Sequence, residues 1–92
     1  MTDLNKKLKI SFSFNFENIL HKISKKDKST FKEIEKQILK IFNNPLIGKP
    51  LRNVLKNYRR VHIDSFVLLY RINEEEIIFV DYDHHDKIYK KY

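Results

Sequence analysis

The stretch from Tyr58 to Tyr70 places the strongest constraint on the fold, because it predicts two strands joined by a tight turn. Side chains of a strand point alternately to its two faces. In the first strand, one face carries Tyr58, Arg60, His62 and Asp64, and the other carries Arg59, Val61 and Ile63. The second strand, Phe66 to Ile72, is apolar at nearly every position, which is typical of a strand buried on both faces. Cations and a histidine beside a buried strand favour phosphate binding.

Two amphipathic helices are predicted in the first half of the chain. Asn15 can cap a helix from Phe16 to about Lys26, because its side-chain oxygen can accept a hydrogen bond from a free backbone amide. Thr30 and Glu33 have the spacing of a capping box, which predicts a second helix that ends at about Asn43. A short polar link joins the two helices, so they form a helical hairpin whose apolar stripes need a sheet to cover.

The remaining segments predict the sheet. Leu8 to Phe14 alternates between apolar and polar residues, and Ile77 to Tyr82 forms a last strand. Asn44 to Asn57 is a loop that contains Gly48, the only glycine. The order strand–helix–helix–strand–strand–strand predicts an α+β fold, with the helical hairpin packed on one face of a mostly antiparallel four-stranded sheet. The expected core consists of Phe12, Ile19, Ile23, Ile34, Ile38, Leu68, Tyr70 and Phe79.

Composition narrows the class of protein. The 92 residues fit a single domain, residues 1–92, and carry 19 Lys and Arg against 12 Asp and Glu, a net charge of +7. That charge favours an anionic partner such as nucleic acid or an acidic protein, although a lysine-rich surface from an organism with an A/T-rich genome would also produce it. The absence of cysteine excludes disulfides and thiolate metal sites. No apolar run approaches the roughly 20 residues of a membrane helix, so we expect a cytoplasmic protein without membrane contact.

Several short motifs follow one another in an order that is typical of a known family. They are Asn-Pro-Leu-x-Gly-x-x-Leu from Asn44, Tyr-Arg at Tyr58 before the His62 strand, Leu-Leu-Tyr ending at Tyr70, and His-His-x-x-x-Tyr ending at Tyr89. The series resembles the RelE/ParE superfamily of toxins from bacterial and archaeal type II toxin–antitoxin modules. The resemblance implies a RelE-like fold over nearly the whole chain. It also implies a cognate RelB-like antitoxin that neutralises the toxin in a hetero-oligomer.

Within the superfamily, the chain is most similar to RelE and YafQ, which are mRNA interferases. Arg59 and Arg60 match the strand cations of RelE relatives, and Tyr89 matches their closing tyrosine. Two positions depart from the RelE pattern. Phe66 and Val67 stand where RelE relatives often open the third strand with an arginine, and His85 replaces their closing arginine.

YafQ-like chains carry histidines at the corresponding places. His62 matches their strand histidine and His85 matches their terminal one, whereas Lys49 replaces a loop histidine and Phe66 replaces a tryptophan. The resemblance therefore implies ribosome-dependent cleavage of mRNA by attack of the 2′-hydroxyl, and hence inhibition of translation. The catalytic residues would combine features of both groups.

Metal-free RNA cleavage needs a base for the 2′-hydroxyl proton, an acid for the leaving 5′-oxygen and cations for the charged phosphorane. Histidine suits the first two tasks, because its unperturbed pKa of about 6.5 lies near the operating pH. The expected catalytic residues are His62, His85, Arg60 and Tyr89, and the expected RNA-binding residues are Lys49, Arg52 and Arg59. The segment from Asp81 to Asp86 also contains metal-ligand residue types, but its spacing fits no metal motif, so we expect neither metal nor cofactor.

Two other functions stay open. A ParE-like protein would keep the fold and inhibit a topoisomerase by binding alone, without acid–base residues. A decayed homologue would only bind nucleic acid, and the missing third-strand arginine favours that interpretation. The joint presence of His62 and His85 favours the nuclease. Arg59 lies on the strand face opposite Arg60, so it could instead contact the helices or an antitoxin.

Overall fold

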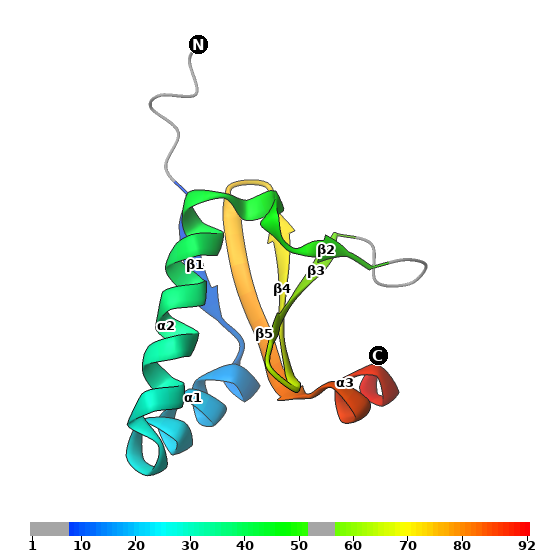
Figure 1. Ribbon diagram of the computed structural model, residues 1–92. Helices are drawn as coiled ribbons and strands as arrows, with labels where there is room; N and C mark the ends of the chain where they lie inside the picture. The colour runs from blue at the N-terminus through cyan, green and yellow to red at the C-terminus, as the bar shows by residue number, and fades with distance from the viewer. Residues whose placement is uncertain (1–7, 52–56) are drawn as a thin grey trace.

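The computed structural model describes residues 8–51 and 57–92, which form one sheet with helices packed on it (Figure 1). Within these residues the sheet has five strands in the order β1-β5-β4-β3-β2. The strands are β1 (Lys9–Phe12), β2 (Lys49–Pro50), β3 (Tyr58–Ile63), β4 (Phe66–Asn73) and β5 (Glu76–His84). β1 is parallel to β5 and the other neighbours are antiparallel, which confirms the mostly antiparallel α+β fold. The extra strand is β2, which a two-residue segment ending in proline does not predict.

The predicted hairpin consists of α1 (Phe14–Lys26) and α2 (Lys28–Asn43). The prediction that Asn15 caps the first helix is wrong. The cap is Ser13, whose Oγ accepts a hydrogen bond from the Phe16 N–H at 3.0 Å. The helix therefore begins two residues earlier than the apolar stripe alone indicates, because a serine hydroxyl satisfies its first free amides as well as an asparagine would.

The capping box predicted for α2 is also wrong, because α2 begins before Thr30. Asp27 caps the helix, and its Oδ1 accepts a hydrogen bond from the Thr30 N–H at 3.1 Å. Glu33 does not turn back to the cap but accepts a hydrogen bond from Gln37 Nε2 at 3.0 Å. The link between the helices is thus a single residue, Asp27, which caps α2 and follows α1.

Among residues 8–51 and 57–92, two further helical segments lie outside the hairpin. They are the short 3₁₀ turn η2 (Pro45–Ile47) and the C-terminal helix α3 (His85–Lys91). The sequence did not predict α3, because seven residues of which only Ile88 is buried present no apolar stripe. No helix in the described part of the chain has the length and apolar character needed to cross a membrane.

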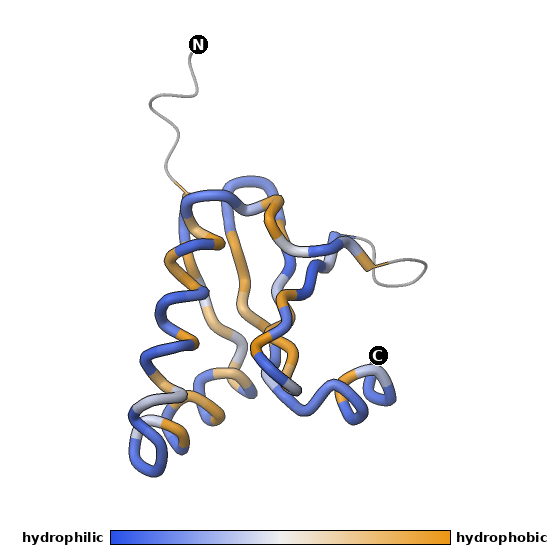
Figure 2. Tube along the Cα trace, viewed as in Figure 1, coloured by the Kyte–Doolittle hydropathy of each residue, from blue (hydrophilic) through white to orange (hydrophobic). Residues whose placement is uncertain are grey.

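The hairpin and α3 cover opposite faces of the sheet (Figure 1). The larger core lies under the hairpin, and Figure 2 shows hydrophobic segments where α1 and α2 face the strands. Five residues expected in this core are fully or almost fully buried: Ile34, Ile38, Leu68, Tyr70 and Phe79. Ile19 and Ile23 pack against it while partly exposed. The prediction that Phe12 is a core residue is wrong: it is 37% exposed at the edge of the core, where its ring contacts Phe16 and Phe79 at centroid distances of 5.3 and 5.9 Å.

The register of β3 determines which side chains face α3. Arg60 is paired with Leu69 and His62 with Val67, and the side chains of Val67, Leu69 and Ile88 form the smaller core under α3. Directly paired residues point to the same face of a sheet. Arg60 and His62 therefore share one face of β3, as the alternation predicted, and that face is the one that α3 covers.

Candidate functional site

Four predicted site residues form a continuous row on the α3 side of the sheet. The rings of His62 and His85 are 6.2 Å apart between centroids, and those of His85 and Tyr89 are 6.0 Å apart. Arg60 Cζ lies 5.6 Å from the centre of the Tyr89 ring. The structure thus brings together all four residues that we expect to be catalytic, although β3 and α3 are separated in sequence by two complete strands.

The row depends on two local regularities. Arg60 and His62 share a face of β3 because they are two positions apart, and His85 and Tyr89 share a side of α3 because they are four apart. The start of α3 is held against the turn between β3 and β4, since the His85 N–H donates a hydrogen bond to the Ser65 carbonyl at 2.9 Å. This bond places His85 opposite His62.

The accessibility of these residues suits a site for a large polyanion. His62 and His85 are exposed, and Tyr89 is 43% exposed. Arg60 is only partly exposed, and its Nε is buried without a hydrogen-bond partner. Leaving a buried donor unsatisfied costs about 1–3 kcal/mol, and a phosphate oxygen that accepted from Arg60 would remove that cost.

Lys49 extends this row of side chains onto β2, the edge strand that pairs with β3. It lies on β2 as the direct partner of Arg60, so it points to the same face, and it is exposed. Tyr70 supports the loop before it: its hydroxyl donates to the Pro45 carbonyl at 2.6 Å and accepts from the Gly48 N–H at 3.0 Å. Burial raises the pKa of the Tyr70 hydroxyl, so it stays a neutral donor.

Arg59 occupies the opposite face from Arg60 and supports the same loop. Its Nη1 donates to the Gly48 carbonyl at 2.7 Å and to the Leu46 carbonyl at 3.2 Å. The structure therefore does not bring Arg59 together with the row, and its role as an RNA ligand stays a prediction. Arg52, also expected to bind RNA, lies outside the described residues.

The far end of α3 is bound to the sheet by a buried carboxylate that sequence analysis did not single out for a role. Asp81 is fully buried on β5, and its Oδ2 accepts hydrogen bonds from Lys91 Nζ at 3.0 Å and from the Tyr92 hydroxyl at 3.1 Å. Lys91 Nζ also lies 2.9 Å from Asp83 Oδ2. Burial and the neighbouring Asp81 raise the pKa of Tyr92 to about 12. A carboxylate within an apolar strand needs such partners, which is the signal that could have identified it.

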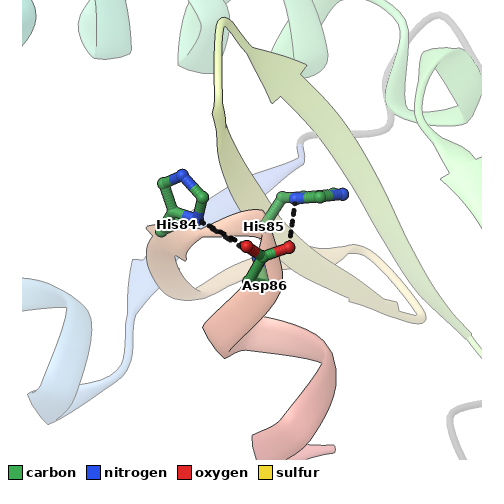
Figure 3. A group of neighbouring side chains, drawn as sticks. All are labelled: His84, His85 and Asp86. Carbon is green, nitrogen blue, oxygen red and sulfur yellow. Dashed lines mark hydrogen bonds and ion pairs between the residues drawn. The ribbon is translucent and has the colours of Figure 1, made fainter.

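Two histidines and an aspartate at the junction of β5 and α3 could hold a metal ion. Figure 3 shows His84 and His85 reaching Asp86 from two sides. The Asp86 oxygens lie 3.8 Å from His84 Nδ1 and 3.1 Å from His85 Nδ1. Two imidazoles and a carboxylate are ligands that transition metals accept. The same carboxylate can instead hold the proton on His85 Nδ1 and leave Nε2 free to accept one.

Two hollows meet at His62, and the carboxylate of Asp64 lines both. One, of about 500 Å³, is lined by His62, Asp64, Ser65, His84 and His85. The larger, of about 740 Å³, lies between the hairpin and the sheet, and carboxylates of Asp27, Glu33 and Asp64 line it. Those carboxylates would repel a phosphate backbone. The cations Lys49 and Arg60 lie on the α3 side of the sheet, away from Asp27 and Glu33.

Comparison with known proteins places the chain among toxins. The family described as "ParE toxin of type II toxin-antitoxin system, parDE" matches residues 10–89. A protein of Methanocaldococcus jannaschii named "Putative toxin RelE4" is 49% identical over 80 residues, which cover 84% of this chain and 85% of the relative.

Solved structures share the fold. The toxin-antitoxin complex RelBE2 from Mycobacterium tuberculosis contains a chain that is similar with a TM-score of 0.70 at 23% identity, over 86% of this chain and 99% of that one. The DinJ-YafQ complex of E. coli contains another, with a TM-score of 0.75 at 20% identity, over 90% of this chain and 99% of that one. At these identities the likeness concerns the fold.

Proposed function

The chain belongs to the RelE/ParE superfamily of type II toxins, and we propose that it is an endoribonuclease that cleaves mRNA on the ribosome. The observation that carries the proposal is the facing pair His62 and His85, with Arg60 beside them. A protein that acted by binding alone would not need two neighbouring imidazoles, whereas cleavage of a phosphodiester uses both. Cleavage in the cytoplasm would stop translation.

The proposed reaction is an in-line transfer at phosphorus. One histidine takes the proton of the 2′-hydroxyl, and the 2′-oxygen forms a bond to phosphorus. The bond from phosphorus to the 5′-oxygen breaks, and the other histidine gives that oxygen a proton. The products are a 2′,3′-cyclic phosphate and a 5′-hydroxyl, so the step needs no water, metal or cofactor. Either histidine can take either role, and Asp86 lies 3.1 Å from His85 Nδ1.

The cations and Tyr89 act on the phosphate and its position. Arg60 can donate to the non-bridging oxygens as charge develops on them, and Lys49 lies next to it on the same face. The Tyr89 ring lies near both Arg60 and His85, so it would limit the movement of both during the reaction. Holding reacting groups in alignment can raise the rate of a reaction as much as stabilising its developing charge does.

The direct test is cleavage of mRNA on ribosomes by the purified chain, read by primer extension. We expect His62→Ala and His85→Ala each to lower the cleavage rate by about 10²–10⁴-fold while ribosome binding stays close to the parent. Arg60→Ala should lower the rate and weaken binding to a smaller degree. His21→Ala is the matched control, because His21 is exposed on α1, outside the row. If both site histidine variants cut like the parent, the acid–base proposal is wrong.

The proposal also includes a neutralising antitoxin. Relatives named RelBE2 and DinJ-YafQ were solved as toxin–antitoxin complexes, and this chain's net charge of +7 favours a partner with an acidic segment. We expect expression of the chain alone to slow growth and co-expression of a neighbouring antitoxin gene to restore it. Equal growth in both cultures would contradict an active toxin.

A second function is favoured by the family description, which names ParE. In that case the chain would inhibit a topoisomerase by binding it. The experiment is DNA supercoiling by gyrase with added chain. Inhibition that persists in His62→Ala and His85→Ala, together with no mRNA cleavage, would favour the ParE-like function over the nuclease.

A further inference from the structure

Asp81 is the one charged residue that is buried among the residues the structure describes. A carboxylate loses several kcal/mol of hydration free energy when it is buried, and its hydrogen bonds and ion pairs must offset that loss. Its Oδ1 accepts the Tyr82 N–H at 2.8 Å, which is a local contact within β5. The two remaining donors, Lys91 and Tyr92, both come from the far end of α3. The carboxylate therefore ties a separate element to the sheet.

The interaction of Asp81 with Lys91 and Tyr92 holds α3, the helix that presents His85 and Tyr89. The helix is held to the sheet at its start by the hydrogen bond from His85 to Ser65, and at its end by Asp81. Between the two ends, only Ile88 is buried. A helix of seven residues is too short to be stable by itself, so its orientation depends on these contacts.

We propose that Asp81 is a positioning residue, which keeps His85 and Tyr89 facing His62 and Arg60 by holding Lys91 and Tyr92 at the end of α3. The inference rests on the proposed nuclease function and adds residues that touch neither RNA nor the reacting atoms. If the far end of α3 is released, the side chains of His85 and Tyr89 lose their alignment, while the cations on β2 and β3 stay in place. Turnover should therefore fall much more than ribosome affinity.

A set of lysine variants tests the inference. Lys91→Met removes the cation and keeps the apolar stem, Lys91→Arg keeps the charge and its donors, and Lys90→Met is the matched control on the same helix. We expect Lys91→Met to lower turnover at saturating ribosomes by about 10²-fold, with ribosome affinity within about threefold of the parent. Lys91→Arg should restore most of the rate, and Lys90→Met should cut like the parent. Asp81→Asn should behave like Lys91→Met.

Amide hydrogen exchange over residues 85–91 gives a readout that does not depend on activity. Lys91→Met should exchange faster there while β4 and β5 exchange as in the parent. Parent-like turnover in Lys91→Met, or failure of Lys91→Arg to restore a lost rate, would overturn the inference. A loss of protection across β4 and β5 would also overturn it, because Asp81 would then serve the whole fold. If the parent chain does not cleave mRNA, the nuclease proposal fails. Unchanged exchange over residues 85–91 in Lys91→Met would separately overturn the positioning role of Asp81.

Discussion

The imidazole of His62 on β3 and that of His85 on α3 lie 6.2 Å apart between ring centroids, inclined at 61°. Both rings border the same open hollow, together with Asp64, Ser65 and His84. The proposed cleavage would use both rings, because one proton leaves the 2′-oxygen and another reaches the 5′-oxygen on the opposite side of phosphorus.

The first prediction follows from that pair and concerns the pH dependence of cleavage. The rate should be bell-shaped in pH, because one histidine must be neutral and the other protonated. His62→Gln should lose one limb of the bell-shaped pH profile, either the acidic or the basic one, and His85→Gln should lose the other. The measurement is single-turnover cleavage across a pH series with ribosome integrity checked at each point. Loss of the same limb in both variants would contradict a division into acid and base.

The second prediction separates the ring of Tyr89 from its hydroxyl. Arg60 Cζ lies 5.6 Å from the ring centre, and no hydrogen bond of the Tyr89 hydroxyl is found among the described residues. Tyr89→Phe should therefore cut within about threefold of the parent, whereas Tyr89→Ala should lose about 10-fold or more, because the cation–π contact of about 0.5–1 kcal/mol and the packing beside His85 disappear. Single-turnover rates of the two variants decide this. Equal losses in both would assign the role to the hydroxyl, as a proton donor or acceptor.

The sequence predicted the paired strands that carry the site because their pattern is local. Alternation in β3 and the apolar run in β4 each indicate a strand without knowledge of the rest of the chain. The side that Arg60 and His62 share follows from the same period of two. The helical hairpin was predicted for the same reason, since its apolar stripe repeats within each helix, although Ser13 and Asp27 cap it rather than Asn15 and Thr30.

What the sequence could not predict depends on contacts between distant segments. Lys49 becomes the partner of Arg60 only because Tyr70 and Arg59 hold the preceding loop. The helix α3 has too few apolar residues to be recognised, and it contacts the rest of the chain through Ser65, Ile88 and Asp81. The proximity of His62 and His85 depends on where α3 packs, so only the family resemblance suggested it from sequence.

The third prediction concerns the loop that presents Lys49. Tyr70→Phe leaves the Gly48 N–H and the Pro45 carbonyl without their partner, which should lower the free energy of unfolding by about 1–3 kcal/mol. A Cβ at Gly48 would lie 2.7 Å from the Tyr70 Oη and 2.9 Å from the Arg60 carbonyl, so Gly48→Ala should also destabilise. Urea denaturation measures both effects. A Tyr70→Phe variant as stable as the parent would show that these two hydrogen bonds contribute nothing.

The fourth prediction gives the pH range over which the Asp83–Lys91 pair stabilises α3. Burial raises the pKa of Asp83, but hydrogen bonds from Lys91 and the His84 backbone outweigh it, so the pKa lies below its usual 3.8. The hydrogen bond to Asp83 is the main cause that raises the pKa of Lys91 above its usual 10.5. Stabilisation linked to Asp83 is thus present above pH 3.8 and lost as the pH falls through the lowered pKa of Asp83. Stabilisation linked to Lys91 is present below pH 10.5 and lost as the pH rises through the raised pKa of Lys91.

The measurement is urea denaturation of the parent and of Asp83→Asn over a pH series, because Asp83→Asn removes this pair and leaves the contact between Lys91 and buried Asp81 in place. The difference in unfolding free energy should be constant between about pH 5 and pH 10 and should shrink on both sides. Because the Lys91 side chain is 43% exposed, water and salt screen the pair, and the difference should be about 1 kcal/mol or less. Lys90→Met should show no such dependence. A difference that persists unchanged at strongly acidic pH would mean that Asp83 does not carry it.

The last prediction concerns metal dependence, because His84, His85 and Asp86 offer three ligand atoms within 4.8 Å of one another. In the proposed reaction, His85 needs its free nitrogen for a proton, and a bound transition metal would occupy a lone pair and hold the ring in place. Cleavage should therefore continue at the parent rate with a chelator selective for transition metals over Mg²⁺, so that the ribosomes stay intact. A zinc-dependent hydrolase in the same buffer shows that the chelator acts. Loss of cleavage that added zinc restores would contradict the metal-free mechanism and assign His85 to a metal site.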